Sequence, residues 1–244
     1  MALPMSADAA KSKQTILGLS ASGKLTAFDV SKPEKAKVLG APTGLMGDTR
    51  LVGIDYRVQN KRLYGVGNTG GIYVIGINGS RETATKVSQL SVALSGTSFG
   101  VDFNPAANRL RVISDTGQNL RHNIDDPAGL PAAGATASDA ALTYPAAGAN
   151  PAVPGTAITA AAYTNNDRSA ATATTLFDID TNLDQVVVQS PANAGLLAAT
   201  GKLKVNAGTP AGFDIYSDLT GRAVLKGSFP GGFQTVDIAI PLEK

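Results

Sequence analysis

The sequence predicts an all-β fold, a β-propeller of about five blades with three to four antiparallel strands in each. Three observations predict it. The stretch from Gly100 to Asn123 matches residues 53–76 without a gap, at an offset of 47 residues. Each copy holds two apolar strands around a Gly-containing turn, which is typical of a β-hairpin. Apolar residues never recur at helical spacing over more than two turns, so we expect almost no helix.

Copies of the same unit can be followed along most of the chain. A first copy, residues 15–30, lacks the leading strand. The second and third copies begin at Gly53 and Gly100, and a degenerate fourth begins at Ile158. The fifth spans residues 212–240. This spacing predicts a ring closed by combining strands from the two chain ends, and a β-sandwich is the alternative.

Length and composition favour one domain. We expect residues 1–13 to be a disordered leader, native or left from a secretion signal, and residues 14–244 to be a single domain. The connection at 126–155 is rich in Ala, Pro and Gly and should be a long surface loop, apart from a strand at 141–144. Cysteine is absent, which excludes thiol chemistry. The net charge of +2 is scattered, so we expect no nucleic acid partner. We also expect no membrane span, because no apolar run approaches the roughly 18 residues that one needs.

The third copy closely resembles a known bacterial family when it is taken with the phrases LVGIDYR, AAYTNN and TTLFDIDTNLDQVVVQSP. The chain is similar to domain-of-unknown-function family 4394 from Thr15 to Ile240. The resemblance implies a propeller-like domain that is secreted, periplasmic or on the cell surface. It implies no activity.

The third copy replaces several residues of the second by polar ones; Arg111, for example, stands where the second copy has Tyr64. The residues of this copy that we expect at a ligand site are Arg109, Arg111, Asp115, Asn119, Arg121 and Asn123. Strand alternation places several of them between blades, where a buried charge needs a partner. Either Arg111 and Arg121 pair with Asp102 or Asp115 in an interblade network, or the guanidiniums and amides bind an anion or polyol.

Tyr163, Asn165 and Asn166 lie at the end of a strand in the fourth copy and are further candidates for ligand contacts. Turn formation is the alternative for the two asparagines. The alternating acidic stretch at 178–184 lacks the Gly and Glu of a calcium loop and is interpreted as a hairpin turn.

An aspartate recurs in the leading strand of three copies, as Asp55, Asp102 and Asp214, with Ala162 at this position in the fourth. Such carboxylates either bind a hard cation such as Ca²⁺ or accept N–H bonds from a neighbouring turn. Asp102 and Asn104 are the candidate metal ligands.

Catalytic motifs are scarce, since His122 is the one histidine and no Gly-x-Ser-x-Gly elbow is present. We therefore expect a non-catalytic exported propeller without a cofactor, with Ca²⁺ as the one candidate. Its partner would be a small polar or anionic ligand, a glycan, or a cell-surface or matrix protein. A metal-dependent hydrolase or lyase of the lactonase type, with its site at the central channel, is the alternative on fold analogy. A structural role in an envelope or matrix is a third.

Overall fold

A computed structural model shows four antiparallel sheets of four strands each, and one of two strands, among the residues it describes. It describes residues 15–29, 32–79, 81–165, 167–168, 172–215 and 235–242. The first sheet, in spatial order, holds β18 (Thr235–Ala239), β1 (Thr15–Ser20), β2 (Leu25–Asp29) and β3 (Lys32–Gly40). The second holds β4 (Leu51–Arg57), β5 (Arg62–Gly67), β6 (Gly71–Asn78) and β7 (Arg81–Gln89).

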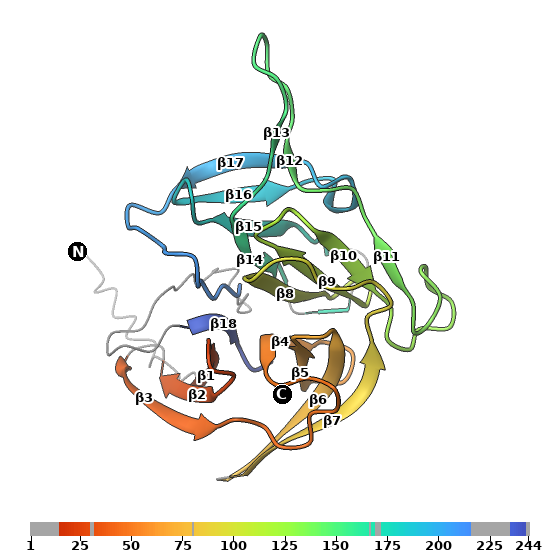
Figure 1. The fold of residues 1–244 in the computed structure, drawn as a ribbon, viewed down its shortest axis with the longest axis vertical. Coiled ribbons are helices and arrows are strands. Elements are labelled where there is room, and N and C mark those ends of the chain that lie inside the picture. Colours follow the sequence, from red (N-terminus) through yellow and green to blue (C-terminus); the bar gives the residue numbers. More distant parts are fainter. Residues whose placement is uncertain are drawn as a thin grey trace, which may run out of the picture.

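The other two sheets have the same order from the inside outwards. The third holds β8 (Phe99–Asn104), β9 (Arg109–Ser114), β10 (Asn119–His122) and β11 (Thr136–Ser138). The fourth holds β14 (Ile158–Tyr163), β15 (Leu176–Asp180), β16 (Gln185–Gln189) and β17 (Leu197–Lys202). The innermost strands β18, β4, β8 and β14 face a common axis, and β3, β7, β11 and β17 form the rim (Figure 1). This arrangement confirms the predicted β-propeller.

The blade count differs from the prediction: the described residues form four blades, each a four-stranded sheet, where the sequence predicted about five. The reason is the placement of the fifth copy. Its last strand, β18, pairs with β1, with Leu17 opposite Ala239, so it completes the first sheet rather than a sheet of its own. Residues 222–233, which carry the predicted hairpin of this copy, lie outside the described residues. The predicted closure by strands from both chain ends is confirmed.

Residues 211–215 run between the fourth sheet and the first (Figure 1). Phe213 packs with Ala160, Ala162 and Ile179 of the fourth sheet in one buried cluster. A Cβ on Gly212 would lie 2.8 Å from the backbone of Asp237 in β18. The segment therefore fills the space between two neighbouring inner strands and brings Asp214 to the axis.

The apolar core consists of clusters between neighbouring sheets. Between the second and third sheets, Tyr64, Ile72 and Val74 pack against residues of β8, β9 and β10. The ring of Tyr64 meets Phe103 edge-on, with centroids 5.2 Å apart. Because each inner strand has a sheet on both sides, its residues are apolar on both faces, as the sequence of the copies indicated.

The long connection after β10 is more structured than a plain surface loop. Its residues 136–138 form β11, and β12 (Thr143–Tyr144) pairs with β13 (Val153–Pro154) in a hairpin that projects from the ring (Figure 1). The predicted strand at 141–144 is thus partly confirmed. The described residues contain one short 3-10 helix, η1 (Ala192–Ala194), and none of their helices is long and apolar enough to cross a membrane.

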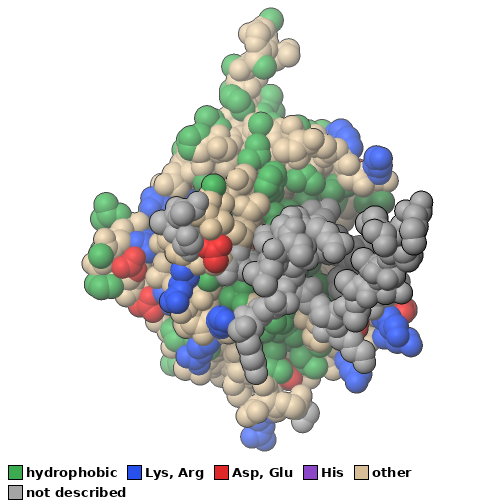
Figure 2. Space-filling model, turned by 180° about the vertical axis from the view of Figure 1, so that it is seen from behind, with side chains coloured by type: hydrophobic (Ala, Val, Ile, Leu, Met, Phe, Trp, Pro, Cys, Tyr) green, Lys and Arg blue, Asp and Glu red, His purple; other side chains and the backbone are tan. Residues whose placement is uncertain are grey.

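On the face of the molecule in Figure 2, Lys and Arg side chains lie in separate groups around the rim, and hydrophobic side chains gather nearer the centre. The described residues of this face therefore form no continuous basic surface, in agreement with the scattered charge of the sequence.

Candidate functional site

A pocket of about 160 Å³ lies between the third and fourth sheets and is called the interblade pocket below. Its lining residues are Asn104, Ala107, Arg109, Arg111, Arg121, Leu130, Tyr163, Ala192 and Asn193. Four of them, Arg109, Arg111, Arg121 and Tyr163, are residues that the sequence predicted at a ligand site. The pocket also contains Asn104, which was predicted as a metal ligand.

The strands of the second and third sheets pair in the same register, and this places Arg111 and Arg121 on a face between sheets. Arg111 of β9 stands opposite Arg121 of β10, just as Tyr64 of β5 stands opposite Val74 of β6 in the second sheet. Tyr64 and Val74 belong to the hydrophobic cluster that joins the second sheet to the third. The polar substitutions of the third copy therefore turn an apolar packing face into a polar one, as the sequence indicated.

Arg111 is the most enclosed of the three, with a side chain 2% exposed. Its Nη1 donates to Asp139 Oδ2 and to Asn119 Oδ1, both at 2.7 Å. Its Nη2 donates to Asn193 Oδ1 at 2.7 Å, and its Nε to the Tyr163 hydroxyl at 3.3 Å. Burial favours the neutral form, but Tyr163 and Asp139 hold the pKa of Arg111 above its ordinary value. The guanidinium is thus fixed in charge and in position.

Arg121 shares the same carboxylate and lies nearer the solvent, with a side chain 23% exposed. Its Nε and Nη2 donate to the two oxygens of Asp139 at 3.0 and 3.1 Å, and its Nη1 donates to the Leu130 carbonyl at 2.9 Å. The predicted pairing of these arginines with Asp102 or Asp115 is wrong, because the partner comes from the long connection. Each of the two terminal nitrogens of Arg121 has one more N–H, which finds no partner among the described residues.

Arg109 is held by the same connection. Its Nη1 donates to Asp126 Oδ2 at 3.0 Å and its Nε to the Leu130 carbonyl at 3.1 Å. This contact and a backbone N–H lower the pKa of the exposed Asp126 carboxyl. Nη2 makes no hydrogen bond within the described part of the chain and lies against Gly129, where an added Cβ would come within 1.3 Å of it.

Tyr163 ends β14 and joins the pocket to the axis. Its hydroxyl accepts from Arg111 Nε at 3.3 Å, and burial raises its pKa, so it keeps its proton. The protonated O–H can act as a donor. The backbone N–H of the same residue donates to Asp102.

The pocket offers donors and almost no unused acceptors. The Leu130 carbonyl accepts from two arginines, and the Ala192 carbonyl accepts from Asn119 and Gln189. Both oxygens of Asp139 are occupied by guanidinium groups. Three arginines against Asp126 and Asp139 leave one positive charge. Such a lining suits a ligand that accepts hydrogen bonds and carries negative charge.

The remaining predicted site residues have other positions. Asp115 accepts from the backbone and hydroxyl of Thr97 in a turn. Asn119 supports Arg111 behind the pocket. Asn123 fixes the following loop by donating to the carbonyls of Asp126 and Pro131.

Two asparagines were predicted at the strand end of the fourth copy. Asn165 donates to Thr174 and to nearby carbonyls. Asn166 lies outside the described residues. The structure thus gives Asn165 contacts of the turn-forming kind, and Asn165 lines the space beside Asp55, Asp102 and Asp214 rather than the interblade pocket.

Sequence reasoning missed Asp139, Leu130 and Asn193, which lie in connections between strands rather than in the strands that the copies share. One signal was present: the connection at 126–155 contains two carboxylates, Asp126 and Asp139. Arginines buried next to this connection need carboxylate partners, and these were the local candidates.

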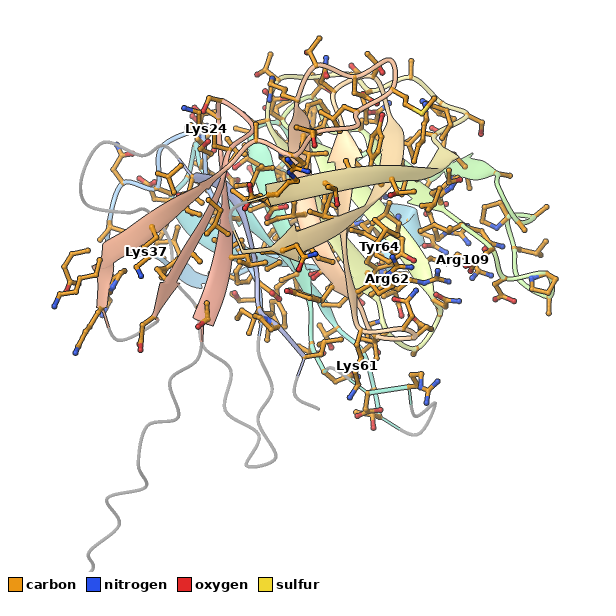
Figure 3. The ribbon with its side chains drawn as sticks, turned by 90° about the horizontal axis from the view of Figure 1, so that it is seen from below. Lys24, Lys37, Lys61, Arg62, Tyr64 and Arg109 are labelled. Atoms are coloured by element: carbon orange, nitrogen blue, oxygen red, sulfur yellow. The ribbon has the colours of Figure 1, made fainter. Side chains whose placement is uncertain are left out.

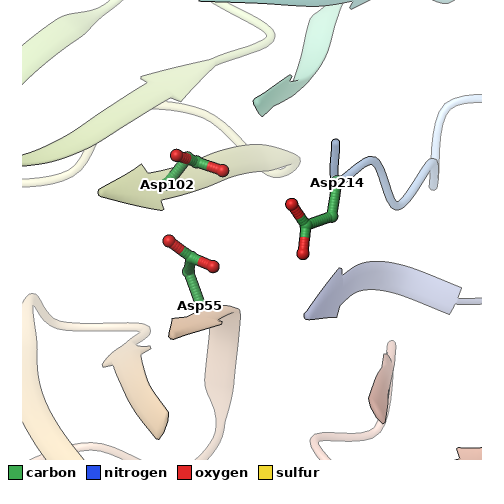
Figure 4. Close-up of side chains that lie close together, drawn as sticks. All are labelled: Asp55, Asp102 and Asp214. Atoms are coloured by element: carbon green, nitrogen blue, oxygen red, sulfur yellow. The ribbon is translucent and has the colours of Figure 1, made fainter. Parts of the chain in front are cut away.

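A second polar site lies on the axis. Asp55, Asp102 and Asp214 have carboxylate oxygens within 4.8 Å of one another, and all three side chains are buried (Figure 4). We call them the axial cluster. The space beside them is about 10 Å³, which is room for one water-sized atom. Asn104 lines the interblade pocket instead, so the predicted metal pair of Asp102 and Asn104 does not share a cavity.

Each carboxylate of the axial cluster accepts an N–H from the neighbouring inner segment. Phe103 donates to Asp55 at 2.8 Å and Ile240 to Asp214 at 2.7 Å. The donors belong to inner strands or lie beside them, not in turns, which corrects that part of the prediction. Burial raises the pKa of all three carboxyl groups, and that of Asp214 reaches about 7.

Asp237 of β18 adds a fourth buried carboxyl group near the axis. Ile240 and Phe103 are equivalent, since each donates its N–H to an aspartate of the axial cluster. Asp237 lies three residues before Ile240, and Gly100 lies three residues before Phe103. Asp237 accepts the N–H of Ile54 at 2.8 Å, and burial raises its pKa well above the usual range. The first sheet thus carries a carboxyl group where the third has a glycine.

Fold and site together define a β-propeller with a donor-lined pocket between two blades. A family model described as domain of unknown function (DUF4394) matches residues 24–240, and the chain belongs to this family. A search of curated proteins finds no significant match.

Two solved structures share the fold. A protein of unknown function from Bacteroides thetaiotaomicron is 16% identical, with a TM-score of 0.51 and coverage of 90% of this chain and 51% of its own. A glutaminyl cyclase from Myxococcus xanthus is 12% identical, with a TM-score of 0.51 and coverage of 92% and 94%. An auxiliary nutrient binding protein from Bacteroides ovatus is 12% identical, with a TM-score of 0.44 and coverage of 75% and 46%. The chain spans about half the length of the two Bacteroides proteins.

Proposed function

We propose that the protein is a non-catalytic binding propeller that takes a small anionic ligand in the interblade pocket. The observation that carries the proposal is the lining: three arginines and a tyrosine hydroxyl face a pocket whose acceptors are already occupied. Hydrogen bonds to charged groups in a partly buried site contribute more than neutral ones. The surplus positive charge supports an anion over a neutral ligand.

Thermal unfolding in the presence of a panel of small anions at constant ionic strength tests this function. A ligand at about 100 times its Kd adds about 2.7 kcal/mol to the free energy of unfolding. For a chain of this size we expect the Tm to rise by roughly 5 to 10 °C. Arg109→Gln should abolish the shift. Arg62→Gln is the matched control, because Arg62 occupies the equivalent position of the second copy and is exposed. Equal shifts in both variants would contradict the proposal.

We also propose that the protein acts outside the cytoplasm, secreted, periplasmic or on the cell surface, as its resemblance to the family implies. A glycan or a surface or matrix protein is the larger partner that this location would offer. Fractionation of the native bacterial cells with an antibody against the chain tests the location. Recovery only in the cytoplasmic fraction would contradict it.

A metal-dependent hydrolase or lyase is the second candidate, and the axial cluster is the observation that favours it. Three carboxylates this close could hold a hard cation such as Ca²⁺ through oxygen. Ca²⁺ should then raise the Tm and a chelator should lower it, with both effects lost in Asp102→Asn. Identical Tm values in Ca²⁺ and chelator would rule the cation site out.

A further inference from the structure

We propose that the ligand of the interblade pocket is a small monocarboxylate, bound by the terminal N–H pair of Arg121 with its body against Ala107, Leu130 and Ala192. This inference rests on the proposed function and narrows it from anions in general to one chemical class. It follows from the charge of the pocket, the geometry of its donors, and its size.

The charge selects a monoanion. Asp126 and Asp139 neutralise two of the three guanidinium groups, so one negative charge balances the pocket. A dianion such as hydrogen phosphate would leave an excess negative charge next to Asp139, whose side chain is 7% exposed. An uncompensated charge at such a site is unfavourable.

The donor geometry selects a planar pair of oxygens. Asp139 occupies the Nε and Nη2 edge of Arg121 with both of its oxygens. The N–H groups that remain, one on each terminal nitrogen, can serve both oxygens of a second carboxylate. Arg121 is also the most exposed of the three arginines, so its remaining donors are the most accessible. The protonated Tyr163 hydroxyl, which accepts from Arg111 Nε, offers another donor.

The size limits the body of the ligand. A cavity of about 150 Å³ holds a benzene molecule, and this pocket has about 160 Å³. Its lining also includes the apolar residues Ala107, Leu130 and Ala192, which suit an apolar body. A monocarboxylate no larger than benzoate fits these limits, whereas an oligosaccharide does not.

Isothermal titration calorimetry with sodium benzoate, sodium propionate and inorganic phosphate tests the inference. We expect benzoate or propionate to bind at least about tenfold more tightly than phosphate. Arg121→Lys keeps the charge but has no planar pair of N–H groups, so it should weaken carboxylate binding by about tenfold or more. Arg62→Lys, on an exposed position of β5, should bind like the wild type, and amide NMR spectra confirm that each variant is folded.

The outcomes separate the inference from the proposed function. Phosphate binding as tightly as the carboxylates, or unchanged carboxylate affinity in Arg121→Lys, would overturn the monocarboxylate and leave an anion site. Binding of neutral glucose in place of all three anions would overturn both. Absence of binding for every probe, in a folded protein, would also overturn both.

Discussion

Arg111 and Arg121 stand opposite each other on the adjacent strands β9 and β10 and share the carboxylate of Asp139, yet they differ in how far they are exposed. The side chain of Arg111 is 2% exposed and that of Arg121 is 23% exposed. The charge of Arg111 stabilises the fold, because its removal leaves several buried polar groups without a partner. The charge of Arg121 lies nearer the solvent, where water can replace a lost contact.

We therefore expect opposite profiles for two alanine variants. Arg111→Ala should lower the free energy of unfolding by about 3 kcal/mol or more, because Asn119, Asn193 and Asp139 each lose a buried donor. Arg121→Ala should cost about 1 kcal/mol or less, yet lose ligand binding. Urea unfolding with Arg62→Ala as a surface control measures the difference. Equal losses of stability in both pocket variants would contradict this reading.

At the scale of the strands, the inner strands pack closely because a glycine, which has no side chain, stands where they meet. A Cβ on Gly100 of β8 would lie 2.5 Å from the backbone nitrogen of Ala161 in β14. Backbone cannot yield as the end of a flexible side chain can. The glycine thus sets how closely the third and fourth sheets approach at the axis.

Gly100→Ala should accordingly lower the free energy of unfolding by about 2 kcal/mol or more through overpacking. Gly201→Ala, on the outer strand β17, is the matched control, because nothing lies within 4 Å of its added Cβ. We expect it to be neutral or slightly stabilising. Denaturant midpoints measured at one pH compare the two, and a neutral Gly100→Ala would show that the sheets can separate at little cost.

Elements within the copies could be predicted from the sequence, and connections between them could not. The Gly-containing turns at Gly70 and Gly117 connect paired strands as expected, because both glycines have the positive φ values that a tight turn needs. The polar face of the third copy was found by comparison with Tyr64 and its neighbours. Asp139 was not, because its connection has no counterpart in the other copies and its course depends on tertiary contacts.

The blade count and the axial cluster also depend on contacts between distant parts of the chain, which the sequence pattern does not show. The alternation of apolar residues predicted a strand at residues 235–239. It could not tell which sheet that strand completes, since this depends on pairing with β1 at the other end of the chain. The aspartates of the leading strands were predicted correctly as acceptors of backbone N–H groups. That their donors are neighbouring inner segments follows only from the ring.

For the whole molecule, the buried carboxyl groups along the axis make stability depend on pH. The folded pKa of Asp214 is about 7, against 3.8 for an ordinary aspartate, so between these values the folded state binds more protons than the unfolded state. Stability is then highest at the acidic side and falls as the pH rises towards 7. His122, whose pKa burial lowers from 6.5 to about 4, acts in the opposite direction below pH 6.5.

Between pH 6.5 and 7.5 the axial groups act without this opposition, so we expect the Tm to fall as the pH rises. One such group changes the free energy of unfolding by at most about 1.4 kcal/mol per pH unit. Asp214→Asn should flatten the profile, and Glu34→Gln, on the exposed outer strand β3, should not. A wild-type Tm that stays constant or rises over this range would contradict the protonated axial cluster.

Lys37 of β3 and Lys24, in the turn between β1 and β2, lie on the opposite side of the molecule from Arg109 (Figure 3). The first sheet, which includes these strands, is the one assembled from both chain ends, with Ser20 of β1 opposite Thr235 of β18. On the ribosome, β1 emerges more than 200 residues before its inner neighbour exists. At roughly 5 to 20 residues per second, this strand edge waits about 10 to 40 seconds unpaired, the interval in which a nascent chain most needs a chaperone.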